Sequence, residues 1–286
     1  MNMPIHPAPR GKLVAIGGAE DKDSETDILR QVLKFAPKPD PRVGVITTAS
    51  SIPDEVFAVY CKAFERLGAS EVMDIRIRER ADAANVAMID MIKQSDVIFI
   101  SGGDQMRLTS IFGGSAALTA IRNRYEDGGV IAGTSAGAAC QSTTMVYGGN
   151  AVDSLRKGAV RMTAGFGLID GVIIDTHFLE RGRFSRLMEV GATNPEYLGL
   201  GLGEDAAVLF DDGIIHAFGP GHVILVDSSG ITGSNVFDLA EGEAVSVHNV
   251  IMHALVNGNA YSLTDRRILG KDELGASKAE KKNAYS

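Results

Sequence analysis

Short apolar runs alternate with helical patterns through the first half of the chain, and this alternation restricts the fold more than any other feature. Strands are expected at 12–16, 42–47, 71–75, 96–100 and 129–132, and helices at 24–35, 53–67, 83–93 and 118–125. Ser24 is the expected N-cap of the first helix. Continuous apolar strands separated by amphipathic helices are typical of a mainly parallel sheet covered by helices on both faces. The sequence therefore predicts an α/β fold that binds ligands at the carboxyl ends of its strands.

The second half has a different pattern. Short strands are expected at 172–174, 206–210, 214–218, 223–226 and 245–253, with one helix at 183–190. Asp211-Asp212-Gly213 is a hairpin signal between two of these strands. We expect this half to extend the same sheet with antiparallel strands, and we expect the glycine-rich run 198–203 to be flexible.

The length fits one large α/β domain or two small ones. Because no Pro/Ser-rich linker divides the sequence, we expect a single α/β domain over residues 11–270, with flexible tails at 1–10 and 271–286. The 286 residues are 45% hydrophobic and 22% charged, with a net charge of −8. No basic cluster is long enough to follow a nucleic-acid backbone, and no apolar run approaches the length of a membrane span. The proline-rich start does not resemble a secretory signal. A cytoplasmic protein with no nucleic-acid or membrane partner is expected.

A Gly-Thr-Ser-Ala-Gly motif at 133–137 follows the apolar run 129–132 directly. A serine at a sharp strand-to-helix turn, with small neighbours, presents its hydroxyl above the sheet, and the next amide can face an oxyanion. The same motif arises by chance in a chain with 33 glycines, and the serine could merely cap a helix. The strand–turn–helix context favours Ser135 as a nucleophile and the Ala136 amide as an oxyanion donor.

A serine nucleophile needs a base, and the base needs an orienting acid. Of the six histidines, His177 is the one that directly follows an apolar strand at the expected active edge. The residues alone leave the acid open among four carboxylates nearby, namely Asp175, Glu180, Glu204 and Asp205.

Two further features are candidates for substrate contacts. Three arginines, Arg181, Arg183 and Arg186, follow His177 within a few residues and could bind carboxylates, although they could equally start a solvated helix. The glycine-rich turns at 17–18, 102–103 and 133 should meet at one edge of the sheet, where Asp104 and Gln105 could add polar contacts.

With these motifs in hand, the chain resembles the cyanophycinase family, which belongs with the dipeptidase E-like serine peptidases. The resemblance covers nearly the whole chain. It is carried by Gly-Gly-Ala-Glu-Asp at 17–21, Gly-Gly-Asp-Gln at 102–105, the serine motif at 133–138, Asp-Thr-His-Phe at 175–178, Arg-Gly-Arg at 181–183 and Gly-Glu-Asp at 203–205. The implied fold is the three-layer sandwich of the class I glutamine amidotransferases, a flavodoxin-like arrangement.

The resemblance also implies roles for particular residues. Ser135 would be the nucleophile, His177 the general base and acid, and Glu204 the orienting acid, with oxyanion donors at Ala136 and at Gly103 in the 102–103 turn. It implies that substrate is held by Gln105, Asp175, Thr176, Arg181, Arg183 and Arg186. Family members form homodimers, so a homodimer is expected, and neither a metal nor an organic cofactor is expected.

The substrate implied by the resemblance is cyanophycin, a poly-aspartate that carries arginine on each side chain through an isopeptide bond. An exopeptidase of this kind would release β-aspartyl-arginine. The family commonly has Gln before the catalytic His, and this chain has Thr176 there, which cannot donate an amide hydrogen bond. The alternative is therefore a serine peptidase that acts on other aspartyl or isoaspartyl peptides.

Three other interpretations are weaker. A non-catalytic module could bind phosphate in the glycine turns, but such a module would not need a base and an acid matched to Ser135. Gly-Gly-Ala-Glu at 17–20 does not fit a dinucleotide-binding loop, because its acidic residue would repel pyrophosphate. A thiol mechanism at Cys140 is not favoured, since the turn carries Ser135 at its apex.

Overall fold

The computed structural model describes residues 11–25, 27–149, 153–270 and 272–274. The expected flexible tails at 1–10 and 271–286 lie outside the described residues, apart from 272–274. In the described part of the chain, no helix is long and apolar enough to span a membrane.

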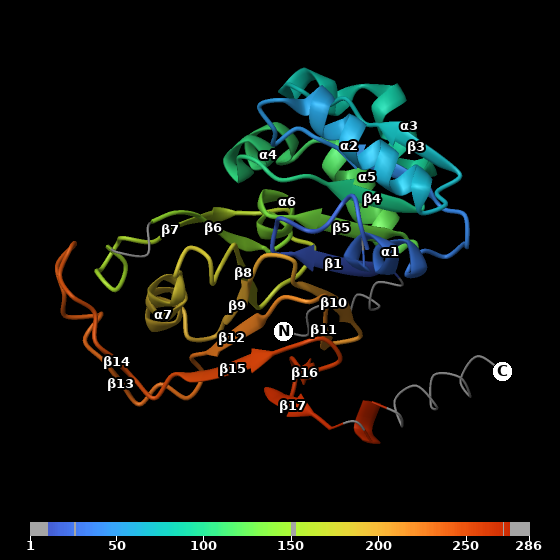
Figure 1. The fold of residues 1–286 in the computed structure, drawn as a ribbon. Helices are drawn as coiled ribbons and strands as arrows, with labels where there is room; N and C mark the ends of the chain where they lie inside the picture. The colour runs from blue at the N-terminus through green and yellow to red at the C-terminus, as the bar shows by residue number, and fades with distance from the viewer. Residues whose placement is uncertain (1–10, 26, 150–152, 271, 275–286) are drawn as a thin grey trace, which may run out of the picture.

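Nine strands form one large mixed sheet, in the order β17-β16-β11-β10-β1-β5-β4-β2-β3 (Figure 1). Neighbouring strands from β1 to β3 are parallel, whereas those from β1 to β17 are antiparallel. The strands are β1 (Lys12–Ile16), β2 (Arg42–Ile46), β3 (Glu71–Asp74), β4 (Val97–Ile100), β5 (Val130–Thr134), β10 (Ala207–Asp211), β11 (Ile214–Phe218), β16 (Ala260–Ser262) and β17 (Arg267–Leu269). The predicted α/β class with parallel strands is confirmed.

The large sheet has a hydrophobic core on each face, because alternate side chains of its buried strands point to opposite sides. On one face, Val14 and Ile16 pack with α1 (Asp27–Lys34) and α2 (Pro53–Arg66). On the other face, Leu13 and Ala15 belong to a larger core with α3 (Val86–Gln94), α4 (Gln105–Phe112), α5 (Ala116–Glu126) and the 3₁₀ turn η1 (Arg80–Ala84). The prediction did not include α4, which starts at Asp104, whose side chain accepts the Met106 N–H (2.8 Å).

A second sheet of four strands corrects the predicted topology. Its order is β15-β12-β9-β8, with β8 and β9 parallel, and it shares no ladder with the large sheet. Its strands are β8 (Val172–Thr176), β9 (Leu198–Leu202), β12 (Val223–Asp227) and β15 (Ile251–Leu255), and α7 (Phe184–Thr193) covers its outer face. Only β10, β11, β16 and β17 extend the first sheet, as the hairpin signal at 211–213 indicated for the first two.

Three local expectations are also wrong. The run 198–203 is not flexible, since it forms the buried strand β9 at the centre of the second sheet. The strand expected at 245–253 breaks at Asn249 (φ 65°) into β14 (Val247–His248) and β15. Ser24 does not cap α1, because its hydroxyl donates to Asp21 (2.5 Å) and the helix begins at Asp27.

The remaining described strands form two small antiparallel pairs. They are β6 (Thr144–Gly148) with β7 (Arg161–Ala164), and β13 (Gly233–Ser234) with β14. The short helix α6 (Ala136–Ala139) follows β5 directly. The register pairs Ile16 with Thr134 and Ile100 with Gly133, so the turns after β1, β4 and β5 leave the sheet at the same edge.

Candidate active site

Ser135 stands at the sharp turn between β5 and α6 in a backbone conformation that L residues avoid, with φ 52° and ψ −114°. The turn requires glycine on both sides. A Cβ on Gly133 would lie 2.1 Å from the Gly137 carbonyl oxygen, and one on Gly137 would lie 2.1 Å from that of Ile100. This is the local geometry of a nucleophile elbow.

His177 follows β8 and brings its imidazole to the serine. Its Nε2 lies 2.9 Å from Ser135 Oγ. The histidine also has a left-handed backbone (φ 48°), and its ring packs against Gly18, where a Cβ would be 2.4 Å from His177 Cε1. The absence of a side chain at Gly18 therefore leaves the space that the imidazole of His177 occupies.

Glu204 completes a line of three polar groups. Its Oε1 lies 2.7 Å from His177 Nδ1, so the ring can donate from Nδ1 to the carboxylate and accept the serine proton at Nε2. The side chains of His177 and Glu204 are 15% and 41% exposed, so water reaches the carboxylate. Of the four acids that the sequence left open, Glu204 is the one that contacts the imidazole in the described structure.

Three consecutive carbonyl groups after β1 hold the three loops of this site together. The oxygens of Ile16, Gly17 and Gly18 accept the backbone N–H groups of Ser135 (3.0 Å), His177 (2.9 Å) and Asp205 (2.9 Å) respectively. Asp205 directly follows Glu204. The segment after β1 therefore fixes the serine, histidine and glutamate loops relative to one another.

A buried carboxylate adds a side-chain link to the same segment. Glu20 is 2% exposed, and it accepts the hydroxyls of Thr134 (2.6 Å) and Tyr60 (2.5 Å). Lys22 Nζ lies 3.4 Å from Glu20 Oε1. From the sequence, Glu20 is noted only as part of the Gly-Gly-Ala-Glu-Asp motif, and Tyr60 is not identified. The contact between them could not be predicted, because it forms only when the fold places α2 beside the elbow.

Ser135 and His177 open into a cavity of about 470 Å³ between the elbow and α2. Gly18 and Gly102 also line it, so the turns after β1, β4 and β5 meet there as expected. None of the six predicted substrate residues is among the described residues that line it; these six are Gln105, Asp175, Thr176, Arg181, Arg183 and Arg186.

The arginine cluster lies beside the site, mostly in internal ion pairs. Asp175 is buried between Arg183 (2.9 Å) and Arg186 (3.1 Å). Burial raises the pKa of Asp175, against the opposing effect of the two guanidinium groups, and burial lowers the pKa of Arg186. Arg181 is exposed.

Two more of the predicted substrate residues are also bonded within the protein. Thr176 is buried, and its carbonyl accepts from Arg183 Nη1 (2.7 Å). Gln105 Nε2 donates to the carbonyl of Val146 (3.3 Å). Sequence spacing placed both near the histidine and serine loops but could not reveal these partners.

Comparisons with known proteins identify the family of this chain. The model of Peptidase family S51 matches residues 13–218. This chain belongs to peptidase family S51. It is therefore a peptidase, a hydrolase of peptide bonds.

Relatives of this S51 peptidase match it over most of their length. A protein of Trichormus variabilis described as a cyanophycinase is 35% identical over 266 residues, which cover 92% of this chain and 89% of that protein. One of Synechococcus elongatus with the same description is 32% identical over 268 residues, covering 93% and 83%. The crystal structure of a peptidase from an acI-B1 actinobacterium has a similar fold, with a TM-score of 0.66, 22% identity, and coverage of 88% and 96%.

In the S51 peptidase, Ala136 directly follows the serine, and the 102–103 turn approaches the serine through Gly102. Ala136 is the first residue of α6, where a backbone N–H has no partner within the helix. A Cβ on Gly102 would lie 3.1 Å from Ser135 Cβ. Gly103 (φ 141°) packs on Ala49, whose carbonyl oxygen would be 2.0 Å from a Cβ. The 102–103 turn thus needs two glycines to approach both the serine and the neighbouring loop.

Neither cysteine of the S51 peptidase has the environment of a nucleophile. Cys140 is fully buried below the elbow, and burial raises the pKa of its thiol. Burial and then the neighbouring Glu65 raise the pKa of Cys61. Among the described residues, no group of three or more His, Cys, Asp or Glu side chains could hold a metal ion.

Proposed function

We propose that this S51 peptidase is a serine exopeptidase that degrades cyanophycin to β-aspartyl-arginine. The observation that carries the proposal is the line of contacts from Ser135 Oγ through His177 to Glu204, at 2.9 and 2.7 Å. Relatives that cover most of the chain are described as cyanophycinases, which supports the polymer as the substrate.

In the proposed reaction, His177 Nε2 takes the proton of Ser135 as Oγ attacks the scissile carbonyl carbon. The amides of Ala136 and Gly103 would stabilise the oxyanion of the tetrahedral intermediate. His177 then gives its proton to the leaving amine, which departs and leaves an acyl-enzyme on Ser135. Water, deprotonated by His177, hydrolyses the acyl-enzyme, while Glu204 stays ionised and stabilises the imidazolium.

Arg181 is proposed to meet the carboxylates of the substrate backbone, because it is exposed close to the histidine loop. Asp175 and Arg186 are proposed to act indirectly by holding Arg183 and the turn at Thr176, which their ion pairs support. Gln105 is proposed to contact substrate from the α4 side.

Thr176 supports one alternative function, namely a serine peptidase for other aspartyl or isoaspartyl peptides, because a buried threonine offers substrate no amide group.

We also propose that the peptidase is a single-domain homodimer that acts in the cytoplasm. A single domain over 11–270 with a three-layer arrangement is supported by the core that joins strands of both sheets with α3, α4 and α5. A homodimer is carried over from the family resemblance, and light scattering of the purified protein tests it. Action in the cytoplasm fits the two free cysteines, Cys61 and Cys140.

The deciding experiment measures β-aspartyl-arginine released from purified cyanophycin by the native chain and by Ser135→Ala. We expect release by the native chain and a loss of at least ~10³-fold in the variant, as for removal of a catalytic nucleophile. If the native chain releases nothing while a fluorophosphonate still labels Ser135, the serine mechanism stands and the substrate is another aspartyl peptide. Release that survives Ser135→Ala would overturn the mechanism.

A further inference from the structure

The cavity in front of Ser135 has an apolar wall that the cleavage chemistry does not use. This wall is the face of α2 that carries Ile52, Val56 and Val59. Ile52 and Val59 are 51% and 45% exposed, although both are large and apolar. Apolar side chains left open to water at a cavity beside a nucleophile are typical of a surface that contacts the hydrocarbon part of a substrate.

A carboxylate and an ammonium group also line the cavity. Glu55 lines the cavity one turn before Val59. Lys22 lines it as well, with its Nζ 5.4 Å from the centre of the Tyr60 ring. Glu55 and Tyr60 are separated by about 7.5 Å along the helix axis at the usual rise per residue. Val56 and Val59 lie between Glu55 and Tyr60 along α2, and the Lys22 ammonium group lies over the ring of Tyr60.

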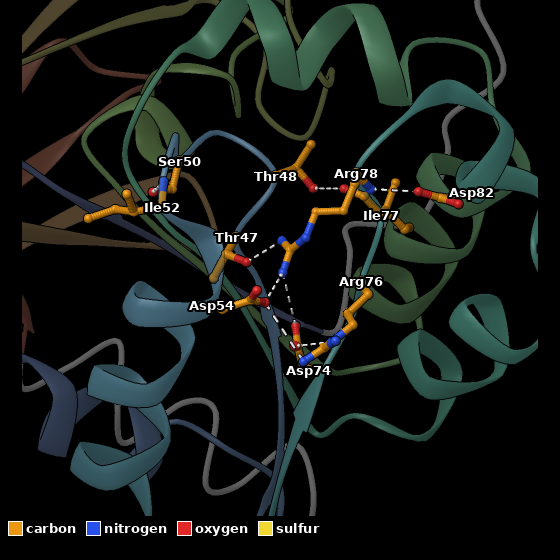
Figure 2. A network of polar contacts seen from close by, with 10 residues as sticks. All are labelled: Thr47, Thr48, Ser50, Ile52, Asp54, Asp74, Arg76, Ile77, Arg78 and Asp82. Atoms are coloured by element: carbon orange, nitrogen blue, oxygen red, sulfur yellow. Dashed lines mark hydrogen bonds and ion pairs between the residues drawn. The ribbon is translucent and has the colours of Figure 1, made fainter.

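A network of polar contacts anchors the start of α2 (Figure 2). Arg78 donates to Thr47 Oγ1 (2.5 Å) and to Asp54 (3.2 Å), and the Ile52 N–H donates to Ser50 Oγ (3.0 Å). The charge of Asp54 is thus compensated. Its neighbour Glu55 has no cationic partner among the residues that the structure describes, so its carboxylate is available to a ligand.

Lys22 keeps some capacity for a ligand too. Its ammonium group donates to the Glu20 carbonyl oxygen (2.7 Å) and lies 3.4 Å from Glu20 Oε1. An ammonium group has three donors, so one remains for an anionic group in the cavity.

We propose that this cavity is a subsite for an arginine residue whose α-carboxylate is free. The α-carboxylate pairs with Lys22, the methylene stem lies on Val56 and Val59, and the guanidinium pairs with Glu55. An arginine attached through its α-amino group by an isopeptide bond has both charges, whereas an arginine within a peptide main chain has no carboxylate to offer. The subsite rests on the proposed function and accounts for a preference for isopeptide-linked arginine.

The test measures binding without turnover. Three ligands are compared for their ability to slow the labelling of Ser135 by a fluorophosphonate: Nα-acetyl-arginine, its α-amide, and Nα-acetyl-citrulline. The amide lacks the carboxylate and the citrulline compound lacks the guanidinium charge. Because charge-assisted hydrogen bonds are the strong ones, we expect acetyl-arginine to bind at least ~10-fold more tightly than either analogue. Equal protection by all three ligands would overturn the subsite.

Variants of Glu55 and Lys22 test which residue binds the guanidinium and which binds the α-carboxylate. Glu55→Gln should abolish the advantage of acetyl-arginine over acetyl-citrulline, and Lys22→Met should abolish its advantage over the amide, while Lys22→Arg should keep it. Glu65→Gln is the matched control, since it makes the same change at an exposed position of α2 outside the cavity lining. If Glu55→Gln behaves like this control, Glu55 does not bind the guanidinium and the proposal fails.

Failure of the subsite and failure of the proposed function give different results. If cyanophycin is hydrolysed but the three ligands do not differ, the function stands and the subsite is wrong. If the ligands differ as expected but cyanophycin is not cleaved, the subsite stands and the native substrate is another compound whose arginine has a free α-carboxylate.

Discussion

The residues of the active site adopt backbone conformations that are costly for L amino acids. Ala19, Ser135, His177 and Asp205 all have φ between 48° and 52°. Such conformations cost of the order of 1–3 kcal/mol each and persist only where the surroundings impose them. Here the surroundings are the successive carbonyls at 16–18, which bind the backbone at three of these four positions.

Gly18→Ala should inactivate the peptidase more than its backbone strain alone would. The new Cβ would lie 2.4 Å from His177 Cε1 and displace the imidazole from Ser135. Gly182→Ala is the matched control, because Gly182 also has a positive φ (57°) but has nothing within 4 Å of its Cβ position. We expect kcat to fall by ~10²-fold or more only in Gly18→Ala, as for a misplaced catalytic group, because Gly182→Ala introduces no clash. Equal kcat in the two variants would contradict the packing role of Gly18.

Glu204→Gln should lower kcat with little change in KM. The amide cannot stabilise the imidazolium, and its NH₂ group can favour the wrong tautomer of His177. We expect a loss of about 10²- to 10³-fold, less than for a fully buried acid, because Glu204 is 41% exposed and water compensates part of its charge. Steady-state kinetics on the polymer measure this, with Glu180→Gln, at an exposed position on the histidine loop, as the control.

At the scale of elements, Glu20 joins three of them, since it lies after β1 and binds Thr134 at the end of β5 and Tyr60 on α2. Burial, and then the charge and hydrogen bond of Glu20, raise the pKa of Tyr60 well above its ordinary value. The tyrosine therefore remains a hydrogen-bond donor across the physiological pH range.

Tyr60→Phe should destabilise the fold by roughly 1–3 kcal/mol, because it leaves a buried carboxylate short of one donor. Urea unfolding at pH 7 measures the loss. Tyr147→Phe is a suitable comparison, since the described part of the chain offers the Tyr147 hydroxyl no hydrogen-bond partner; its ring lies under Arg161. A Tyr60→Phe protein as stable as Tyr147→Phe would contradict the linking role of Glu20.

The sequence predicted the bounds of helices and strands better than it predicted which strands pair with one another. β1, β2, α2 and the β10–β11 hairpin begin and end within one or two residues of expectation, because apolar periodicity and turn residues act locally. Whether a strand joins the first or the second sheet depends on its pairing with strands that are distant in sequence. The local apolar pattern of a short strand does not determine that pairing. The same limit applies to the site: Ser135 and His177 stand out by position, but the pairing of Arg186 with Asp175 and the wall on α2 exist only once the elements pack.

At the scale of the whole molecule, Asp227 connects the two sheets. It lies in β12 of the second sheet, and its carboxylate accepts from Tyr261 of β16 in the large sheet (3.3 Å) and from Arg266 (2.8 Å). Burial raises its pKa, but the Ser229 N–H and the Arg266 guanidinium outweigh burial and hold the pKa of Asp227 below its usual value.

A carboxyl whose pKa is lower in the folded than in the unfolded state stabilises the fold above its unfolded pKa, about 3.9, and loses that contribution as pH falls through the folded value. Asp227→Asn should therefore lower the free energy of unfolding at pH 7 by roughly 1–3 kcal/mol. The gap between variant and native protein should narrow below about pH 4. Urea unfolding at pH 7 and pH 3 checks both statements; a gap that is unchanged or wider at pH 3 would contradict them.

The carbonyls of Ile16, Gly17 and Gly18 bind three loops that are synthesised at different times. Their partners lie about 120, 160 and 190 residues further along the chain, so the last loop arrives when most of the protein has been synthesised. A growing chain that contains β1 and β5 includes Ser135, but it still lacks the proposed base His177 and the proposed acid Glu204. We expect activity to emerge only after β9 and the Glu204 loop have left the ribosome. On this expectation, the order of synthesis keeps the peptide-cleaving site inert until most of the molecule has been made.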